Sequence, residues 1–464
     1  MRCLKDRSAT WQPSEVKPFQ TYLSSARTAL PPDPLQQWAS LFFSASALTF
    51  LLSIAASQSF LALATLLYFV YLLRANPKPR IAFPPVKLPL ALYCLFTVLS
   101  IFWAENKAVG GFAVRKLALF LILLLTVNLI VSARHLNFLL KAMFVEAAVA
   151  GVVGAVQFVE QYERVRVEHP HRIYLYMTVT RIRGFMGHWM NFGGQQMLMF
   201  CALLAFLLLS MKWKPGSGSV AHVTPDGNQG NALKSRPAKV WWIVIAVIAL
   251  SILLNFTRGV WLGCFVGAVY LVARWRARWL WALPILVGMT LIAGPRLLRQ
   301  REESVLHPSR DASLAVRFEM WHAGWKMIER HPLVGVGPEN IPEVYDLYLP
   351  PGKSPIVGYH AHLHNDYIQL AAERGLPCLA VWVWFMVALA WGIVQLRRRL
   401  ASSQWITHAA LAGWLAFVAE GFFEFNFGTS PVLMVFLFVM AAPYAAERIE
   451  QDRQGASIAI SSSR

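Results

Sequence analysis

Long apolar runs recur along the whole chain, and the short segments between them hold most of the charged residues. A helix needs about 20 mostly apolar residues to cross the hydrocarbon of a bilayer, and these runs approach that length. They lack the two-residue alternation of membrane-barrel strands, so an α-helical bundle is expected. The pattern predicts about twelve transmembrane helices. Their windows are 39–56, 58–74, 88–104, 113–132, 139–159, 192–211, 240–256, 259–274, 279–294, 377–395, 405–424 and 430–447.

The composition favours the same class of protein. The chain has 464 residues, of which 56% are apolar and only 14% are charged. A soluble chain of this length carries nearer a quarter of its residues as charge. The net charge of +19 would suit nucleic acid, but the basic residues lie in loops between the apolar runs, so membrane lipids are expected as partners and nucleic acid is not. The five cysteines are scattered and show no metal-ligand spacing.

Lysine and arginine predict the orientation, because they accumulate in cytoplasmic loops. With the N-terminus inside, each short inner loop is basic, as at 274–278 and 397–399. The predicted organisation is as follows: a cytoplasmic segment at 1–38; nine helices over 39–294, with a periplasmic loop at about 160–191 and a cytoplasmic loop at about 212–239; a large periplasmic loop at 295–376; three helices over 377–447; and a cytoplasmic tail at 448–464.

The large loop at 295–376 is predicted to form a helical subdomain. Residues 312–331 have the apolar spacing of an amphipathic helix, which Pro332 would end. A second helix is expected to begin near His362 and to continue into the tenth span. The apolar stripe of the first helix is expected to contain Val316, Met320, Trp321, Trp325 and Ile328.

Arginines in the outer segments break the positive-inside pattern. Arg258 lies at the turn between two apolar runs, where a cation is costly and usually marks a functional site or an internal ion pair. Arg181 and Arg183 precede a glycine-rich segment, 184–194, that contains His188 and leads into the sixth span, where a helix N-terminus favours an anion. Arginine suits bidentate binding of phosphate oxygens, although contact with lipid headgroups is the simpler alternative.

Three histidines, His360, His362 and His364, alternate with other residues beside Asp366. Positions i and i+2 do not face each other on a helix, whereas an extended segment would place all three on one side. A metal site, an inert structural role and a general base are all open. The general base is favoured, because no second ligand cluster accompanies the histidines and imidazole exchanges a proton near neutral pH.

Several of these segments together resemble a known family. Arg317 and Trp321 precede the run 331–338, His-Pro-Leu-Val-Gly-Val-Gly-Pro, and His364-Asn365 is followed by nine residues and then Gly375. This pattern resembles the O-antigen ligase and polymerase family of the Wzy_C type, which includes the WaaL ligases. The ligase signature, His-[Asn/Ser/Gln], nine residues and Gly-x-x-Gly, is matched except that Cys378 replaces the last glycine. The resemblance covers roughly 180–395.

The resemblance implies a metal-independent glycosyltransferase of GT-C-like architecture in the bacterial inner membrane, with its active site facing the periplasm. The donor would be a glycan on undecaprenyl pyrophosphate, and the acceptor a sugar hydroxyl of lipid A–core. No metal or other cofactor is expected, and the outer segments contain no Asp-x-Asp motif.

The implied reaction is one inverting displacement. His364 would act as the general base, and Arg258 and Arg183 would stabilise the leaving pyrophosphate. Asp366 and Glu373 are weaker candidates for orienting the histidine. The residues expected to contact substrate are Arg181, His188, Arg317, His362 and Asn365.

Two alternatives stay open. A polymerase that joins lipid-linked repeats would use the same donor and differ only in the acceptor. A transporter or flippase would also have many spans, but such proteins usually show two matching halves, and the long loop has no counterpart in the first half of the chain.

Overall fold

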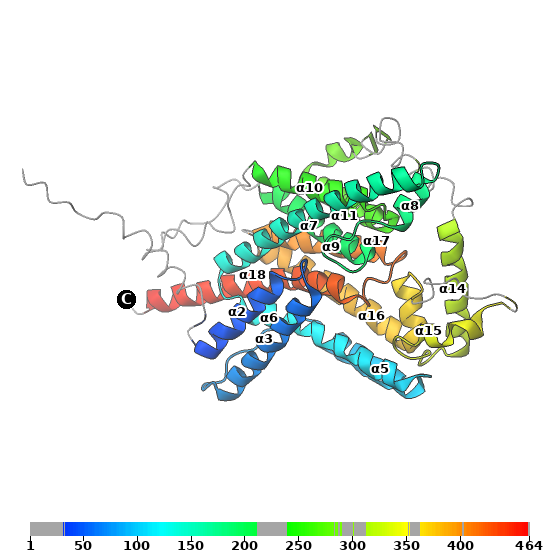
Figure 1. Ribbon diagram of the computed structural model, residues 1–464. Coiled ribbons are helices and arrows are strands. Elements are labelled where there is room, and N and C mark those ends of the chain that lie inside the picture. The colour runs from blue at the N-terminus through cyan, green and yellow to red at the C-terminus, as the bar shows by residue number, and fades with distance from the viewer. Residues whose placement is uncertain are drawn as a thin grey trace, which may run out of the picture.

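The computed structural model describes residues 33–210, 239–282, 312–350, 362–400 and 403–462, together with a few single positions between these ranges. Every regular element in these ranges is a helix, which confirms the prediction of an all-α polytopic membrane protein. The α-helices are α2 (Pro34–Ala47), α3 (Ile54–Arg74), α4 (Lys87–Ser100), α5 (Lys107–Ala113), α6 (Leu121–Leu129), α7 (Ala133–Glu168), α8 (Ile173–Val179), α9 (Trp189–Leu209), α10 (Val240–Leu254), α11 (Arg258–Arg276), α14 (Ala312–Arg330), α15 (Ile341–Val344), α16 (Asp366–Arg399), α17 (Gln404–Glu420) and α18 (Ser430–Ser462) (Figure 1). The 3₁₀ helices are η1 (Ile101–Trp103), η2 (Val114–Phe120), η4 (Ala277–Trp281) and η6 (Tyr345–Tyr348).

The described part has seven helices long and apolar enough to cross a membrane, and two shorter apolar ones at Lys87–Trp103 and Val240–Leu254. The sequence predicts about twelve spans. Two predicted spans correspond to α2 and α17, whose 14 and 17 residues are fewer than a full crossing needs. The run predicted at 279–294 lies mostly outside the described residues.

Glycines allow α11 to pack closely against its neighbours. Gly259, Gly263 and Gly267 recur every four residues, as small residues do where membrane helices approach closely. A Cβ on Gly263 would lie 2.9 Å from the carbonyl oxygen of Ala416 in α17, and one on Gly267 would lie 2.5 Å from Cys201 Sγ in α9. Helix α11 therefore packs closely against α17 and α9.

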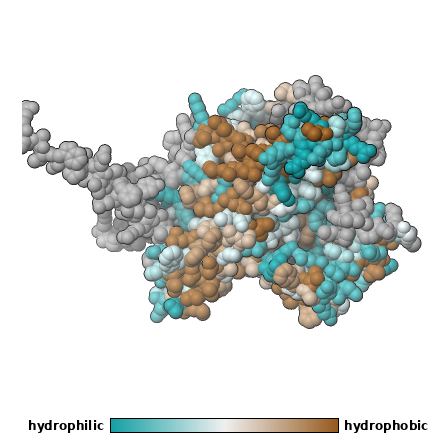
Figure 2. Space-filling view, viewed as in Figure 1, coloured by the Kyte–Doolittle hydropathy of each residue, from teal (hydrophilic) through white to brown (hydrophobic). Residues whose placement is uncertain are grey.

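Helices α14 and α15 lie at the end of the bundle opposite the C-terminus, with α14 crossing that end (Figure 1). Hydrophilic residues gather there, whereas hydrophobic residues cover much of the middle of the same face (Figure 2). The buried face of α14 includes Met320, Ala323 and Met327, which pack with Leu363 and α16. Trp325, which the predicted stripe included, is instead 56% exposed.

Helix α16 begins at Asp366, close to the predicted start near His362, and continues into the tenth predicted span. It breaks at Gly375, where φ is 82°. The segment 332–337 docks into this break: Val336 N donates to Ala372 O at 2.8 Å, and Leu376 N donates to Pro332 O at 2.8 Å. A Cβ on Gly375 would lie 2.2 Å from Leu333 O, so only glycine fits there. This contact anchors the helical loop to the membrane helix that follows His364.

Candidate active site

His364 lies in the short segment before α16, and its backbone is held by neighbours on both sides. Leu363 N donates to Gln369 Oε1 at 2.6 Å, and Trp321 Nε1 of α14 donates to Leu363 O at 3.0 Å. The next residue, Asn365, caps α16 by accepting a hydrogen bond from Ile368 N at 2.9 Å. His364 itself has a φ of 49°, an uncommon conformation for a residue other than glycine. Such backbone strain persists where the surrounding contacts determine the geometry.

The partner of His364 is Glu424, which lies in the loop 421–429 between α17 and α18. His364 Nδ1 lies 3.2 Å from both carboxylate oxygens of Glu424. Both residues are buried, with exposed fractions of 8% and 3%. The pair therefore forms a histidine–carboxylate arrangement largely shielded from water.

Glu424 is surrounded by positively charged or protonatable groups. His362 Nδ1 lies 3.9 Å from Oε1, and Arg317 Nη2 lies 3.9 Å from Oε2. Burial by itself would raise the pKa of the Glu424 carboxyl, but His364, His362 and Arg317 outweigh burial and hold that pKa well below its usual range. Glu424 is therefore an ionised carboxylate at neutral pH.

His362 stands beside His364, with the ring centroids 4.1 Å apart. Burial, helped by the neighbouring His364 and opposed by Glu424, lowers the pKa of His362 to about 4. His362 is thus neutral at physiological pH. The contact between the two rings agrees with the expectation that alternate residues of an extended segment lie on one side. His360 lies outside the described residues.

The two residues after His364 hold the Glu424 loop in place. Asp366 N donates to Gly421 O at 2.7 Å, and Asp366 Oδ1 accepts a hydrogen bond from Phe427 N at 3.0 Å. Asn365 Nδ2 donates to Phe422 O at 3.0 Å. Asp366 therefore braces the loop, and Glu424 is the carboxylate that meets the His364 ring.

His188 and Arg181 approach the cluster from the start of α9. His188 is the N-cap of α9, and its Nδ1 accepts a hydrogen bond from Met190 N at 3.3 Å. Burial lowers the pKa of His188, Glu424 raises it, and His364 and Arg181 lower it. His188 therefore interacts electrostatically with the His364–Glu424 pair. Arg181 Nη1 donates to Thr257 Oγ1 at 3.4 Å, which ties Arg181 to the start of α11.

Arg258 is the first residue of α11 and follows the N-cap Thr257. A Cβ on Gly259 would lie 3.4 Å from Glu420 Cγ and 3.5 Å from Phe423 Cβ, so α11 begins beside the loop that carries Glu424. Arg258 is half-buried there. The structure thus links Arg181 and Arg258 through Thr257 and places both near the Glu424 loop.

Arg183 occupies a different position from Arg181. Its side chain is exposed, and its backbone N donates to Gln157 Oε1 at 3.1 Å. The next residue, Gly184, has a φ of 54°, and a Cβ there would lie 2.7 Å from the Phe192 ring. The turn therefore directs Arg181 toward the start of α11 and leaves Arg183 at the surface.

Three of these side chains could hold a metal ion. His362, His364 and Glu424 offer ligand atoms that all lie within 4.8 Å of one another. The histidine run in the sequence does not indicate this group of three ligands, because Glu424 lies in a loop 60 positions away from His364. The guanidinium of Arg317 lies at the same carboxylate and repels a cation electrostatically.

Glu424 is the functional candidate that the sequence interpretation missed. It is the last residue of the apolar run 405–424, which predicts a membrane span. An ionisable residue in such a run usually faces an internal partner or cavity, and that signal could have identified it.

The fold and this cluster define a polytopic membrane protein with a buried histidine–carboxylate pair and several arginines at one end of its helical bundle. Residues 243–383 match the family model described as O-antigen ligase, which supports the resemblance to that family found in the sequence. The matched segment contains Arg258, Arg317 and His364. Among curated proteins, none matches the chain. The family match supports an O-antigen ligase or polymerase function, with lipid-linked glycans as substrates.

Proposed function

We propose that the protein transfers a glycan from undecaprenyl pyrophosphate to a sugar hydroxyl of lipid A–core at the periplasmic face of the bacterial inner membrane. The reaction is a single inverting displacement that needs no metal ion. The observation that carries this proposal is the buried contact of His364 Nδ1 with both oxygens of Glu424 at 3.2 Å.

Glu424 sets the proton position on His364. Because this carboxylate is ionised, Nδ1 carries the proton and donates a hydrogen bond to Glu424, which leaves Nε2 unprotonated. A carboxylate partner also fixes the orientation of the ring and stabilises the imidazolium that forms. His364 Nε2 takes the proton of the acceptor hydroxyl as that oxygen attacks the anomeric carbon of the donor.

Arginines replace a divalent cation at the leaving group. The bond that breaks joins the anomeric carbon to the pyrophosphate, and the electron pair leaves on a phosphate oxygen. Arg258 and Arg181, linked through Thr257, lie at the start of α11 and stabilise this charge. Arg183 meets the donor at the exposed rim.

The remaining residues contact or position substrate. His188 and His362, both neutral, line the approach to His364. Arg317 shares the Glu424 carboxylate and contacts an acceptor oxygen. Asn365 acts mainly by position, since its amide already bonds Ile368 N and Phe422 O.

The acceptor decides between ligase and polymerase. Purified protein in detergent is supplied with the lipid-linked donor together with either lipid A–core or a second lipid-linked repeat. Product with lipid A–core supports the ligase. Product only with the second repeat identifies a polymerase, and transfer to neither acceptor contradicts both assignments. Because detergent removes the compartments, any transfer also excludes a protein that only transports.

A further inference from the structure

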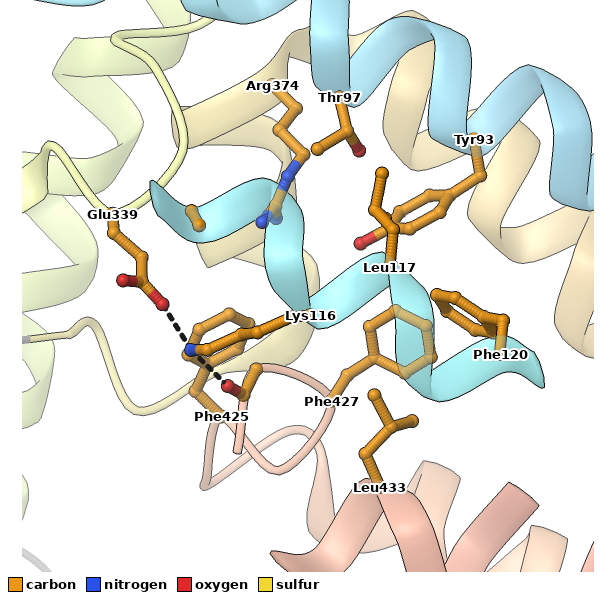
Figure 3. A pocket seen from close by; sticks show the side chains of 12 residues that line it. Tyr93, Thr97, Lys116, Leu117, Phe120, Glu339, Arg374, Phe425, Phe427 and Leu433 are labelled. Atoms are coloured by element: carbon orange, nitrogen blue, oxygen red, sulfur yellow. Dashed lines mark hydrogen bonds and ion pairs between the residues drawn. The ribbon is translucent and has the colours of Figure 1, made fainter. Parts of the chain in front are cut away.

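A second pocket is lined in part by the loop 421–429 that carries Glu424 (Figure 3). Phe425, Phe427 and Gly428 line this pocket together with residues from α4, η2 and α16. Phe425 also contacts the catalytic region, with its ring centroid 6.3 Å from that of His362. The pocket and the histidine cluster therefore share one wall.

The ionisable side chains that line the pocket carry a net positive charge. Lys116 and Arg374 are the cations, and Glu339 is the anion. Lys116 forms an ion pair with Glu339 and donates to Gly428 O at 2.7 Å. Lys116 and Glu339 are 29% and 33% exposed, so Glu339 can turn to water if another anion takes its place.

Arg374 is the feature that points to a ligand. Its side chain is only 9% exposed, and Figure 3 shows its guanidinium directed into the pocket toward Lys116. Its Nη1 lies 3.1 Å from Glu373 Oε2, but Nε and Nη1 have no hydrogen-bond partner among the residues that the structure describes. Buried donors are normally satisfied, because an unmade bond costs the full desolvation of the group.

We propose that this pocket binds a phosphate group of the acceptor lipid. The inference rests on the proposed transfer reaction and adds the substrate group that the pocket recognises. A phosphate oxygen accepts from Nε and Nη1 of Arg374, which make no hydrogen bond within the described residues, and replaces Glu339 at Lys116, since charge-assisted bonds of this kind are strong. The hydroxyl of Tyr93, which points to the same space in Figure 3, supplies a further donor.

The position of the pocket relative to the Glu424 loop assigns it to the acceptor. Arg258 begins α11 beside the part of the loop before Glu424, at Phe423, whereas the pocket is formed by the part after it, at Phe425 to Gly428. The donor pyrophosphate and the acceptor phosphate thus bind at different parts of the loop whose carboxylate orients the base. Two such sites hold both substrates near His364 at once.

The test compares Lys116→Ala with Lys107→Ala, an exposed lysine on the preceding helix, using lipid A–core with and without its phosphates. Losing a charge-assisted bond raises the KM for phosphorylated acceptor by about tenfold to a hundredfold. Lys107→Ala leaves this KM unchanged, and Lys116→Arg restores most of it. With dephosphorylated acceptor, the wild type itself has the raised KM, and Lys116→Ala adds nothing. An unchanged KM in Lys116→Ala, or an equal rise with both acceptors, overturns the proposal.

Binding without donor separates this inference from the proposed reaction. Arg374→Gln and wild-type protein, each verified by its melting temperature, are titrated with phosphorylated lipid A–core in the absence of donor. Competition with inorganic phosphate and with phosphatidylglycerol in nanodiscs distinguishes the sources of the phosphate. Weaker binding in Arg374→Gln supports the inference even if no transfer is found. Binding of phosphatidylglycerol alone, or equal acceptor binding by both proteins, contradicts it even if transfer occurs.

Discussion

Replacing Glu424 by glutamine tests the link between the carboxylate and the base. The two side chains have nearly the same shape, so packing in the loop 421–429 is retained. The substitution removes the negative charge that accepts from His364 Nδ1 and that balances Arg317. The glutamine NH₂ can donate to Nδ1 instead, which moves the proton to Nε2 and blocks the base.

The size of the effect follows from the bonds that are lost. A hydrogen bond to a charged group contributes about 1.5–3 kcal/mol. At about 1.4 kcal/mol for each factor of ten, this corresponds to about a tenfold to a hundredfold fall in kcat. Complete loss of the base sets the upper limit, because general base catalysis contributes about 10²–10⁴-fold.

The assay is glycan transfer by purified protein in detergent, with kcat and KM measured for each substrate. Glu343→Gln, at an exposed carboxylate in α15, is the control and is expected to behave like the wild type. The melting temperature of each variant shows that it is folded. A kcat for Glu424→Gln within threefold of the wild type would refute the proposed role of the carboxylate.

Three further predictions concern the arginines, the metal and the pH. Arg258→Ala is expected to lower the rate about 10²–10³-fold, and Arg258→Lys to recover little of it; full recovery would mean that charge alone suffices. Transfer is expected to survive EDTA, and a loss that Mg²⁺ or Mn²⁺ reverses would show that a metal is required. His362 has a folded-state pKa lowered to about 4, so the unfolded chain binds its proton first as the pH falls below about 6.5. The free energy of unfolding is therefore expected to fall as the pH drops from about 6.5 to about 4, by at most about 3 kcal/mol. Thermal melts of His362→Asn should show a weaker pH dependence than those of the wild type. An unchanged pH dependence would contradict the neutral state of His362 in the folded protein.

Much of the helical architecture could be predicted, because membrane helices are recognisable in a sequence as long apolar runs. Each predicted run except 279–294 overlaps a described α-helix, and 279–294 begins within the 3₁₀ helix η4. Helix ends were less predictable. The start of α16 near His362 was predicted, but its break at Gly375 was not, because the segment 332–337 that hydrogen-bonds to the break is a long-range contact that no local pattern contains.

The site could be predicted only as far as local chemistry reveals it. His364 was found from its neighbours, and Arg258 from its position between two apolar runs. Glu424 is 60 positions from His364, and the two meet only because Asp366 and Asn365 bind the loop 421–429. The choice between Arg181 and Arg183 likewise depends on the turn at Gly184.

The most direct test of the account is the single-turnover rate of glycan transfer by His364→Ala, with saturating donor and acceptor. The account predicts a folded protein that binds both substrates and transfers the glycan about 10²–10⁴-fold more slowly than the wild type. A rate within tenfold of the wild type in a correctly folded variant would contradict it, because the acceptor hydroxyl would then lose its proton to another group.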